Sequence, residues 1–111
     1  MDKISQYEQI ICDILQKYAN FRASDAVLKS FLIIDKERKQ YQLLSVGWKN
    51  EKYIYTIAFH LSILNEKIWI HQNNTESQIA DELCELGVQK MDIVLGFISE
   101  KARVYTGFAV E

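Results

Sequence analysis

The sequence predicts an α+β fold, in which a four-stranded antiparallel meander sheet is flanked by an N-terminal helix and a helix after the last strand. Apolar residues recur at helical spacing over the first nineteen residues, and over residues 27–73 they alternate with polar ones. A helix-start pattern then follows at Thr75. Because 111 residues suffice for one hydrophobic core, we expect a single domain spanning residues 1–111.

The N-terminal helix is predicted from an apolar stripe along one of its faces. The stripe consists of Ile4, Tyr7, Ile11, Ile14, Leu15 and Tyr18. These residues recur three or four positions apart and therefore share one side of a helix. The remaining surface mixes acidic and basic side chains, which favours docking on a protein core over binding to a membrane surface.

Four strands joined by three hairpins are predicted from polar clusters at residues 35–40, 49–52 and 65–66. Strict alternation in the third strand assigns one set of side chains to the core face. That set is Tyr53, Tyr55, Ile57, Phe59, Leu61 and Ile63. The opposite face of this strand is then semi-polar.

The predicted hairpin loops also fix the pairing of the strands. A two-residue loop at Asn65 and Glu66 sets Ile63 opposite Ile68, Leu61 opposite Ile70, Ser62 opposite Trp69 and His60 opposite His71. The loop at residues 49–52 sets Trp48, Val46 and Leu44 beside Tyr53, Tyr55 and Ile57, again on the core side. Glu66 lacks the tolerance of glycine for positive φ, so a longer loop with shifted pairing remains an alternative.

The second helix is predicted over residues 76–86, because Thr75 and Gln78 have the spacing of a capping box and Gly87 suits a C′ position. Beyond it we expect a short apolar run at residues 93–97 and a helical turn at residues 99–104. The apolar tail at residues 105–110 has two readings. It packs on its own subunit, or it docks into a partner as an added strand.

Charge and cysteine content exclude several classes of function. The net charge is −2, with 13 basic and 15 acidic residues, so we do not expect the chain alone to bind nucleic acid tightly. Two cysteines, Cys12 and Cys84, form no disulfide framework, which favours a reduced, intracellular protein. Neither a signal peptide nor a membrane-spanning run is present, so a cytoplasmic location without membrane contact is expected.

No motif for catalysis or cofactor binding is recognisable, and we assign no catalytic, cofactor-binding or metal-ligating residue. His60 and His71 are predicted to lie side by side, and two histidines can begin a metal site. The pairing supplies no third ligand. A metal-dependent hydrolase that uses His60 and His71 is therefore kept only as an alternative to a binding protein.

A partner-binding surface is instead predicted on the semi-polar sheet face and in the apolar tail. An indole on a sheet face indicates a partner surface or a covering segment, and Trp69 lies on this face whereas Trp48 is assigned to the core. The candidate surface consists of His60, Ser62, Trp69, His71, Tyr105 and Phe108. A sheet with helices on one side only also favours a homo-oligomer.

The order of motifs along the whole chain resembles the XisI family of cyanobacterial proteins, named for a control factor in excision of the fdxN element. The matching residues are Tyr41-Gln42-Leu43, Val46-Gly47-Trp48, His60-Leu61-Ser62-Ile63, Lys67-Ile68-Trp69-Ile70, Thr75-Glu76, residues 79–83 and 92–97, Arg103, and residues 105–110. The resemblance implies an accessory factor that acts with a site-specific recombinase and an XisH-type nuclease-like protein. It carries over no catalytic residue. Direct contact with DNA is the rival binding role.

Overall fold

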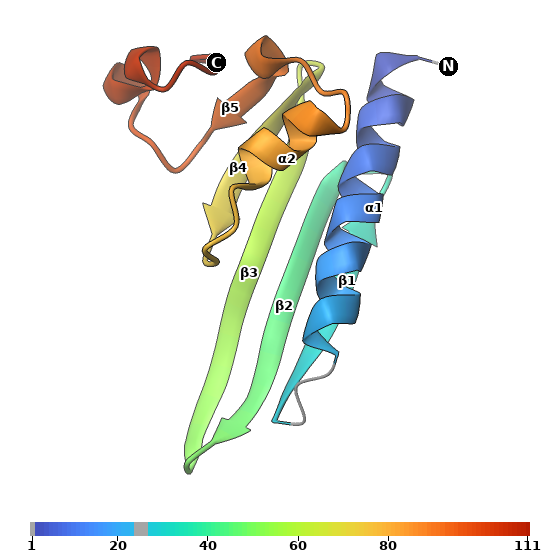
Figure 1. Cartoon of the computed structure of the whole chain (residues 1–111), viewed down its shortest axis with the longest axis vertical. Coiled ribbons are helices and arrows are strands. Elements are labelled where there is room, and N and C mark those ends of the chain that lie inside the picture. The colour runs from blue at the N-terminus through green and yellow to red at the C-terminus, as the bar shows by residue number, and fades with distance from the viewer. Residues whose placement is uncertain (1, 24–26) are drawn as a thin grey trace.

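The computed structural model describes residues 2–23 and 27–111 and confirms the α+β class. Its elements are α1 (Lys3–Arg22), β1 (Leu28–Asp35), β2 (Gln40–Lys49), β3 (Lys52–Leu64), β4 (Lys67–Asn73), α2 (Ile79–Glu85), η1 (Lys90–Asp92), β5 (Ile93–Leu95) and η2 (Glu100–Tyr105). The strands form one mixed sheet in the order β1-β2-β3-β4-β5 (Figure 1). The prediction of four strands was therefore wrong by one.

The fifth strand, β5, pairs parallel to β4, with Ile68 opposite Ile93 and Ile70 opposite Leu95. Three residues are too short to show a period of two, so the sequence revealed only an apolar run there. The tail continues this edge, because Ala109 bridges to Val94 and its N–H donates to the carbonyl of Ile93 at 2.8 Å. The structure thus places the tail on its own subunit.

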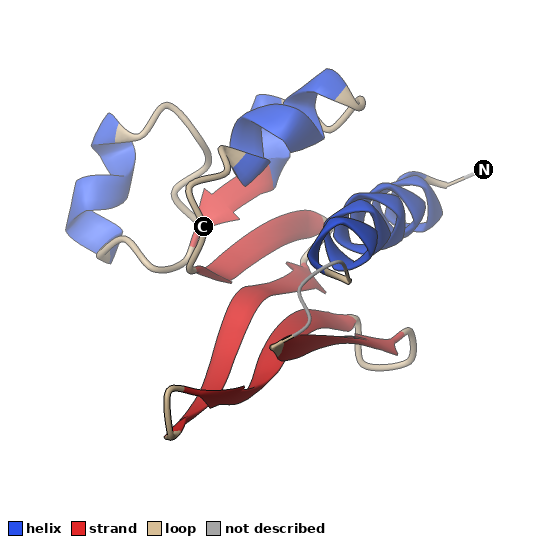
Figure 2. Ribbon diagram, turned by 60° about the horizontal axis from the view of Figure 1, so that its bottom comes forward, coloured by secondary structure: helices blue, strands red, loops and turns tan. Residues whose placement is uncertain are grey.

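Helices α1 and α2 lie on the same side of the sheet, which we call the front face (Figure 2). The hydrophobic core lies between them and the strands. Its largest fully buried side chains are Ile11, Leu15, Tyr41, Leu43, Phe59, Leu61, Ile68, Ile70, Ile79, Leu83 and Ile93. On the opposite side, the back face, no long helix covers β1, β2 and β3 within the part of the chain that the structure describes.

The apolar stripe of α1 faces this core as predicted, with Tyr7, Ile11, Ile14 and Leu15 buried. The helix begins after Asp2, whose carboxylate accepts the N–H of Ser5 at 2.8 Å and so acts as the N-cap. No helix among residues 2–23 and 27–111 is long and apolar enough to cross a membrane.

Three tyrosine–carboxylate hydrogen bonds, each 2.5 Å long, connect α1 to the rest of the described chain. They run from Tyr7 to Asp92, from Tyr18 to Glu82, and from Tyr41 to Glu8. Each of these carboxylates also forms an ion pair with a lysine. Asp92 pairs with Lys3, Glu82 with Lys17, and Glu8 with Lys39. These groups join α1 to η1, α2 and β2.

The pairing of β2 with β3 contains a β-bulge that changes the faces of the sheet. Leu43 pairs with Phe59 but Leu44 pairs with Ile57, so Ala58 is an extra residue in β3. Its carbonyl is not left free, because it accepts the N–H of Asn74 at 2.9 Å.

The bulge overturns part of the predicted core. The pairs Leu44–Ile57, Val46–Tyr55 and Trp48–Tyr53 occur as predicted. However, β3 switches sides at Ala58, so these residues project to the back face while Phe59, Leu61 and Ile63 project to the front. Trp48 is accordingly 65% exposed and is not a core residue.

The hairpin between β3 and β4 has the predicted two-residue loop. Asn65 and Glu66 both have positive φ, 52° and 62°, and the pairs Ile63–Ile68, Leu61–Ile70 and Ser62–Trp69 are confirmed. The fourth predicted pair is wrong. The register shifts between His60 and Leu61, so that His60 faces Gln72 rather than His71.

The capping box predicted for α2 is absent, and the helix begins at Ile79 rather than at residue 76. The side chain of Asn73 instead accepts the N–H of Thr75, which forms a turn ahead of the helix. The helix ends at Glu85, one residue before the predicted end, and Gly87 follows the C-cap Leu86 as the predicted C′ residue. Gly87 has φ +115°, and Val88 donates to the carbonyl of Leu83 at 3.0 Å, as in a Schellman motif.

Candidate partner-binding surfaces

Five polar side chains form a hydrogen-bonded group on the back face, which we call the polar cluster. Its members are Gln40, Gln42, His60, Ser62 and His71. Strand pairing positions them, because Gln42 lies opposite His60 and Gln40 lies opposite Ser62. Four of them are half-buried, and Ser62 is fully buried at 1% exposure.

The direction of the hydrogen bonds shows what this cluster can do. The amide oxygen of Gln40 accepts from Ser62 Oγ at 2.6 Å and from His60 Nε2 at 2.9 Å. Ser62 Oγ, having donated its proton, accepts from His71 Nε2 at 2.9 Å. A serine nucleophile needs the reverse, a histidine that accepts the serine proton. The cluster therefore forms a connected network in which Gln40 accepts the proton of Ser62.

The two histidines are neighbours as predicted, with ring centroids 4.9 Å apart, although they are not a direct cross-strand pair. Burial lowers the pKa of His60 and of His71, and the nearby His60 lowers the pKa of His71 further. Both rings are therefore neutral at pH 7. Among the described residues, no group of three or more histidine, cysteine, aspartate or glutamate side chains is placed to hold a metal ion.

Trp69 lies beside the polar cluster and is covered by the protein's own C-terminal segment, which we define as residues 96–111. The guanidinium of Arg103 lies 5.2 Å from the centre of the Trp69 ring. Arg103 also donates to the carbonyls of Ile98, at 3.0 Å, and Val110, at 3.2 Å. Gly96 allows close approach, because a Cβ there would lie 3.3 Å from Trp69 Cε3.

Of the six residues predicted as a partner surface, four are neighbours on the back face, whereas Tyr105 and Phe108 lie elsewhere. His60, Ser62 and His71 form the back-face network, and Trp69 lies beneath Arg103. Tyr105 is 87% exposed on η2. Phe108 instead packs against the core, where the ammonium of Lys90 lies 5.3 Å from its ring centre.

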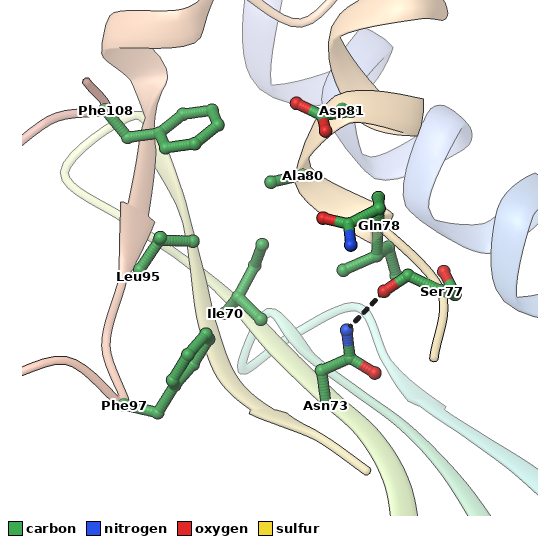
Figure 3. A pocket seen from close by; sticks show the side chains of 10 residues that line it. Ile70, Asn73, Ser77, Gln78, Ala80, Asp81, Leu95, Phe97 and Phe108 are labelled. Carbon is green, nitrogen blue, oxygen red and sulfur yellow. Dashed lines mark hydrogen bonds between the residues drawn. The ribbon is translucent and has the colours of Figure 1, made fainter. Parts of the chain in front are cut away.

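Phe108 also lines a pocket of about 120 Å³ between α2 and the β4–β5 edge (Figure 3). Ile70, Leu95, Phe97 and Phe108 form one wall, and Gln78, Ala80 and Asp81 form the other. At its end, Asn73 donates a hydrogen bond to the carbonyl of Ser77 at 2.9 Å. The volume and the apolar wall suit a single apolar side chain, and the carboxylate of Asp81 adds a negative charge.

A second surface, which the sequence prediction missed, lies on the back face beyond the polar cluster. We call it the aromatic strip, and it consists of Phe31, Ile33, Trp48, Tyr53 and Tyr55, which are 48% to 65% exposed. Trp48 and Tyr53 are in contact, with ring centroids 5.1 Å apart. Alternation and pairing assigned Trp48, Tyr53 and Tyr55 to the core, and the bulge at Ala58 places them on the back face instead. No local sequence signal marks that bulge.

Fold and surfaces together define a small α+β protein with an apolar pocket beside α2 and an exposed aromatic strip on the back face. The family model described as XisI protein matches residues 1–110. The chain therefore belongs to the XisI family, as its motifs indicated.

Two crystal structures from Anabaena variabilis are similar over nearly the whole chain. One is of a XisI-like protein, with 36% sequence identity, a TM-score of 0.91, and coverage of 99% of this chain and 100% of that one. The other is of the fdxN element excision controlling factor XisI, with 36% identity, a TM-score of 0.85 and the same coverage. No curated protein matches the chain significantly.

Proposed function

We propose that this protein is a non-catalytic control factor for excision of a DNA element, and that it acts by binding an XisH-type nuclease-like protein. Family membership supports the control role, because a similar structure is that of an excision controlling factor. The polar cluster supports a non-catalytic role, since its serine proton is directed to Gln40 and away from His71.

The observation that carries the partner-binding part is the exposure of apolar side chains in the C-terminal segment. Phe97, Val104 and Tyr105 are all more than half exposed there. Phe97 lies at the apolar pocket, which is preformed and takes one side chain of a partner. The segment is held in place by Arg103, so its surface is ordered before a partner binds.

Co-expression with the XisH-type protein of the same genome tests this proposal. Size-exclusion chromatography with light scattering should show one joint peak, because buried aromatic anchors dominate the energy of most protein interfaces. Tyr105→Glu and Phe97→Glu should abolish that peak. Point substitutions are needed, because deleting the tail would also remove the hydrogen bond from Ala109 to Ile93.

Tyr55→Glu is the matched control, since Tyr55 is an exposed tyrosine on a different surface. It should leave the joint peak in place. Separate peaks for the unmodified pair would contradict the proposal. So would a tight gel shift of DNA by this chain alone at physiological salt, which would favour direct DNA contact.

A further inference from the structure

We propose that the aromatic strip is the interface of a homodimer, in which the back faces of two copies pack against each other. This inference goes beyond the proposed function, because it requires no other protein. It starts from the exposure of Phe31, Ile33, Trp48, Tyr53 and Tyr55 on one side of three neighbouring strands.

The strand pairing shows that these side chains form one continuous surface. On the back face, Trp48 and Tyr53 make one cross-strand row. The next row contains Lys29, Val46 and Tyr55, and the one after it contains Phe31, Leu44 and Ile57. Leu44, in the centre, is only 5% exposed, because its larger neighbours surround it. These three rows are contiguous and apolar except for Lys29, and Ile33 continues the strip in the next row, opposite Gln42.

The exposed area is close to what a stable dimer needs. The five side chains are about half exposed and contribute roughly 100 Å² each, so the strip exposes about 500 Å². That lies near the upper end of the largest apolar patch on a typical monomer, about 300–600 Å². A standard interface covers about 800 Å² on each partner, which the strip supplies together with its polar rim at Gln42 and His60.

The distribution of charge fits a second copy of the same chain. The three rows contain one cation, Lys29, and no carboxylate. A two-fold axis parallel to β2 exchanges the positions of β1 and β3, so each row meets the same row of the second copy. Lys29 of one copy then lies over the Tyr55 ring of the other copy, which is a favourable cation–π arrangement. The two Lys29 side chains do not face each other.

The sheet geometry permits this packing. Two sheets stack about 10 Å apart when their strands are nearly aligned, at about 30°. The hairpin between β2 and β3 extends beyond the end of α1 (Figure 1), so Trp48 and Tyr53 lie at a part of the sheet far from the helices.

The charge of this surface does not favour other kinds of partner. Lys29 is its single positive charge, and one positive charge offers little for an acidic protein or a nucleic acid to bind.

The test measures the mass of the purified chain alone, without any XisH-type protein, by size-exclusion chromatography with light scattering. The unmodified protein should have twice the 13.0 kDa mass of one chain at tens of micromolar. Trp48→Glu and Tyr55→Glu should raise the dissociation constant of the dimer at least roughly 30-fold and give monomers. Tyr105→Glu, at an exposed tyrosine outside the strip, should remain a dimer.

Fluorescence of the unmodified protein provides a second readout that does not depend on the folding of a glutamate variant. Dilution below the dissociation constant should expose Trp48 and shift its emission to the red, and Trp48→Phe should remove that shift. A monomeric unmodified protein would overturn the proposal. A dimer that persists in both glutamate variants would also overturn it. If the unmodified protein is a monomer and Tyr55→Glu loses its joint peak with the XisH-type protein, the strip binds the XisH-type protein instead of a second copy.

Discussion

Two glutamates occupy backbone conformations that favour glycine. Glu51 and Glu66 have φ values of 65° and 62°, and each follows an asparagine that also has positive φ. Asparagine tolerates this left-handed region, whereas most side chains there cost about 1 kcal/mol because Cβ lies too close to the backbone. Both two-residue loops therefore retain conformational strain at their second position.

Replacing either glutamate with glycine should stabilise the protein. We expect Glu51→Gly and Glu66→Gly each to raise the free energy of unfolding by about 0.5–1 kcal/mol, since Asn-Gly is the preferred sequence for such loops. Urea denaturation monitored by circular dichroism measures the change. Glu37→Gly removes the same charge from a turn position without positive φ, and it should leave the stability unchanged or lower it. Equal effects in all three variants would contradict the strain argument.

Helix α1 depends on polar contacts as well as on its apolar stripe. Burial alone would raise the pKa of Asp92, but hydrogen bonds from Tyr7 and Lys3 outweigh it and lower that pKa. The pKa values of Glu8 and Glu82 are lowered in the same way, against burial, by their tyrosine and lysine partners. These carboxylates are therefore charged and stabilised in the folded protein.

Removing a tyrosine hydroxyl from one of these contacts should destabilise the helix. Tyr7→Phe leaves the buried carboxylate of Asp92 without its 2.5 Å donor, and we expect a loss of about 1.5–3 kcal/mol in the free energy of unfolding. Urea denaturation tests this value. Tyr105→Phe removes an exposed hydroxyl and should have no effect. If both variants unfold at the same urea concentration, the hydrogen bond contributes nothing.

Elements with a long, regular pattern were predictable from the sequence, and those decided by tertiary contacts were not. The stripe of α1 and the two-residue loop after Leu64 follow from local residue types. The bulge at Ala58 depends on Asn74, sixteen residues later, which satisfies the carbonyl of the extra residue. Similarly, the predicted cap at Thr75 is absent because Asn73 and Thr75 form local turns there, with Asn73 accepting the N–H of Thr75 and Thr75 accepting the N–H of Ser77.

Stability of the whole molecule should fall with acid in two steps. The pKa values of His60 and His71 lie below the ordinary value of 6.5 in the fold, so the unfolded chain binds more protons below that pH. The free energy of unfolding should therefore begin to decrease as pH falls through 6.5. The lowered carboxylate pKa values add a second decrease, below the ordinary values of 4.5 for glutamate and 3.8 for aspartate.

A histidine variant separates the two steps. His60→Gln with His71→Gln should remove the decrease between about pH 6.5 and pH 5 and keep the one at lower pH. Urea denaturation at a series of pH values, at one protein concentration, measures both steps. An unchanged slope in the upper range would show that the histidine pair is not responsible.

The candidate surfaces were predicted less well than the fold, because they depend on how distant segments meet. The sequence indicated that the Trp69 face would be covered, and Arg103, thirty-four residues later, provides that cover. The sequence could not show that Tyr105 is exposed while Phe108 packs against the core, since β5 and α2 decide which of the two is covered. The aromatic strip was missed because one extra residue in β3 places Tyr53, Tyr55 and Ile57 on the opposite side from the rest of that strand's predicted core residues.

The tyrosine–carboxylate contacts also have a consequence for the order of folding during synthesis. The hydrogen bond from Tyr7 to Asp92 joins residues 85 positions apart, and that from Tyr18 to Glu82 joins residues 64 apart. Helix α1 is translated well before either partner, since Glu82 and Asp92 each follow it by more than fifty residues. The β1–β3 meander, whose pairings are local, can form earlier. Helix α1 can therefore pack its apolar stripe on the meander first, and its hydrogen bonds to Asp92 and Glu82 can form only afterwards.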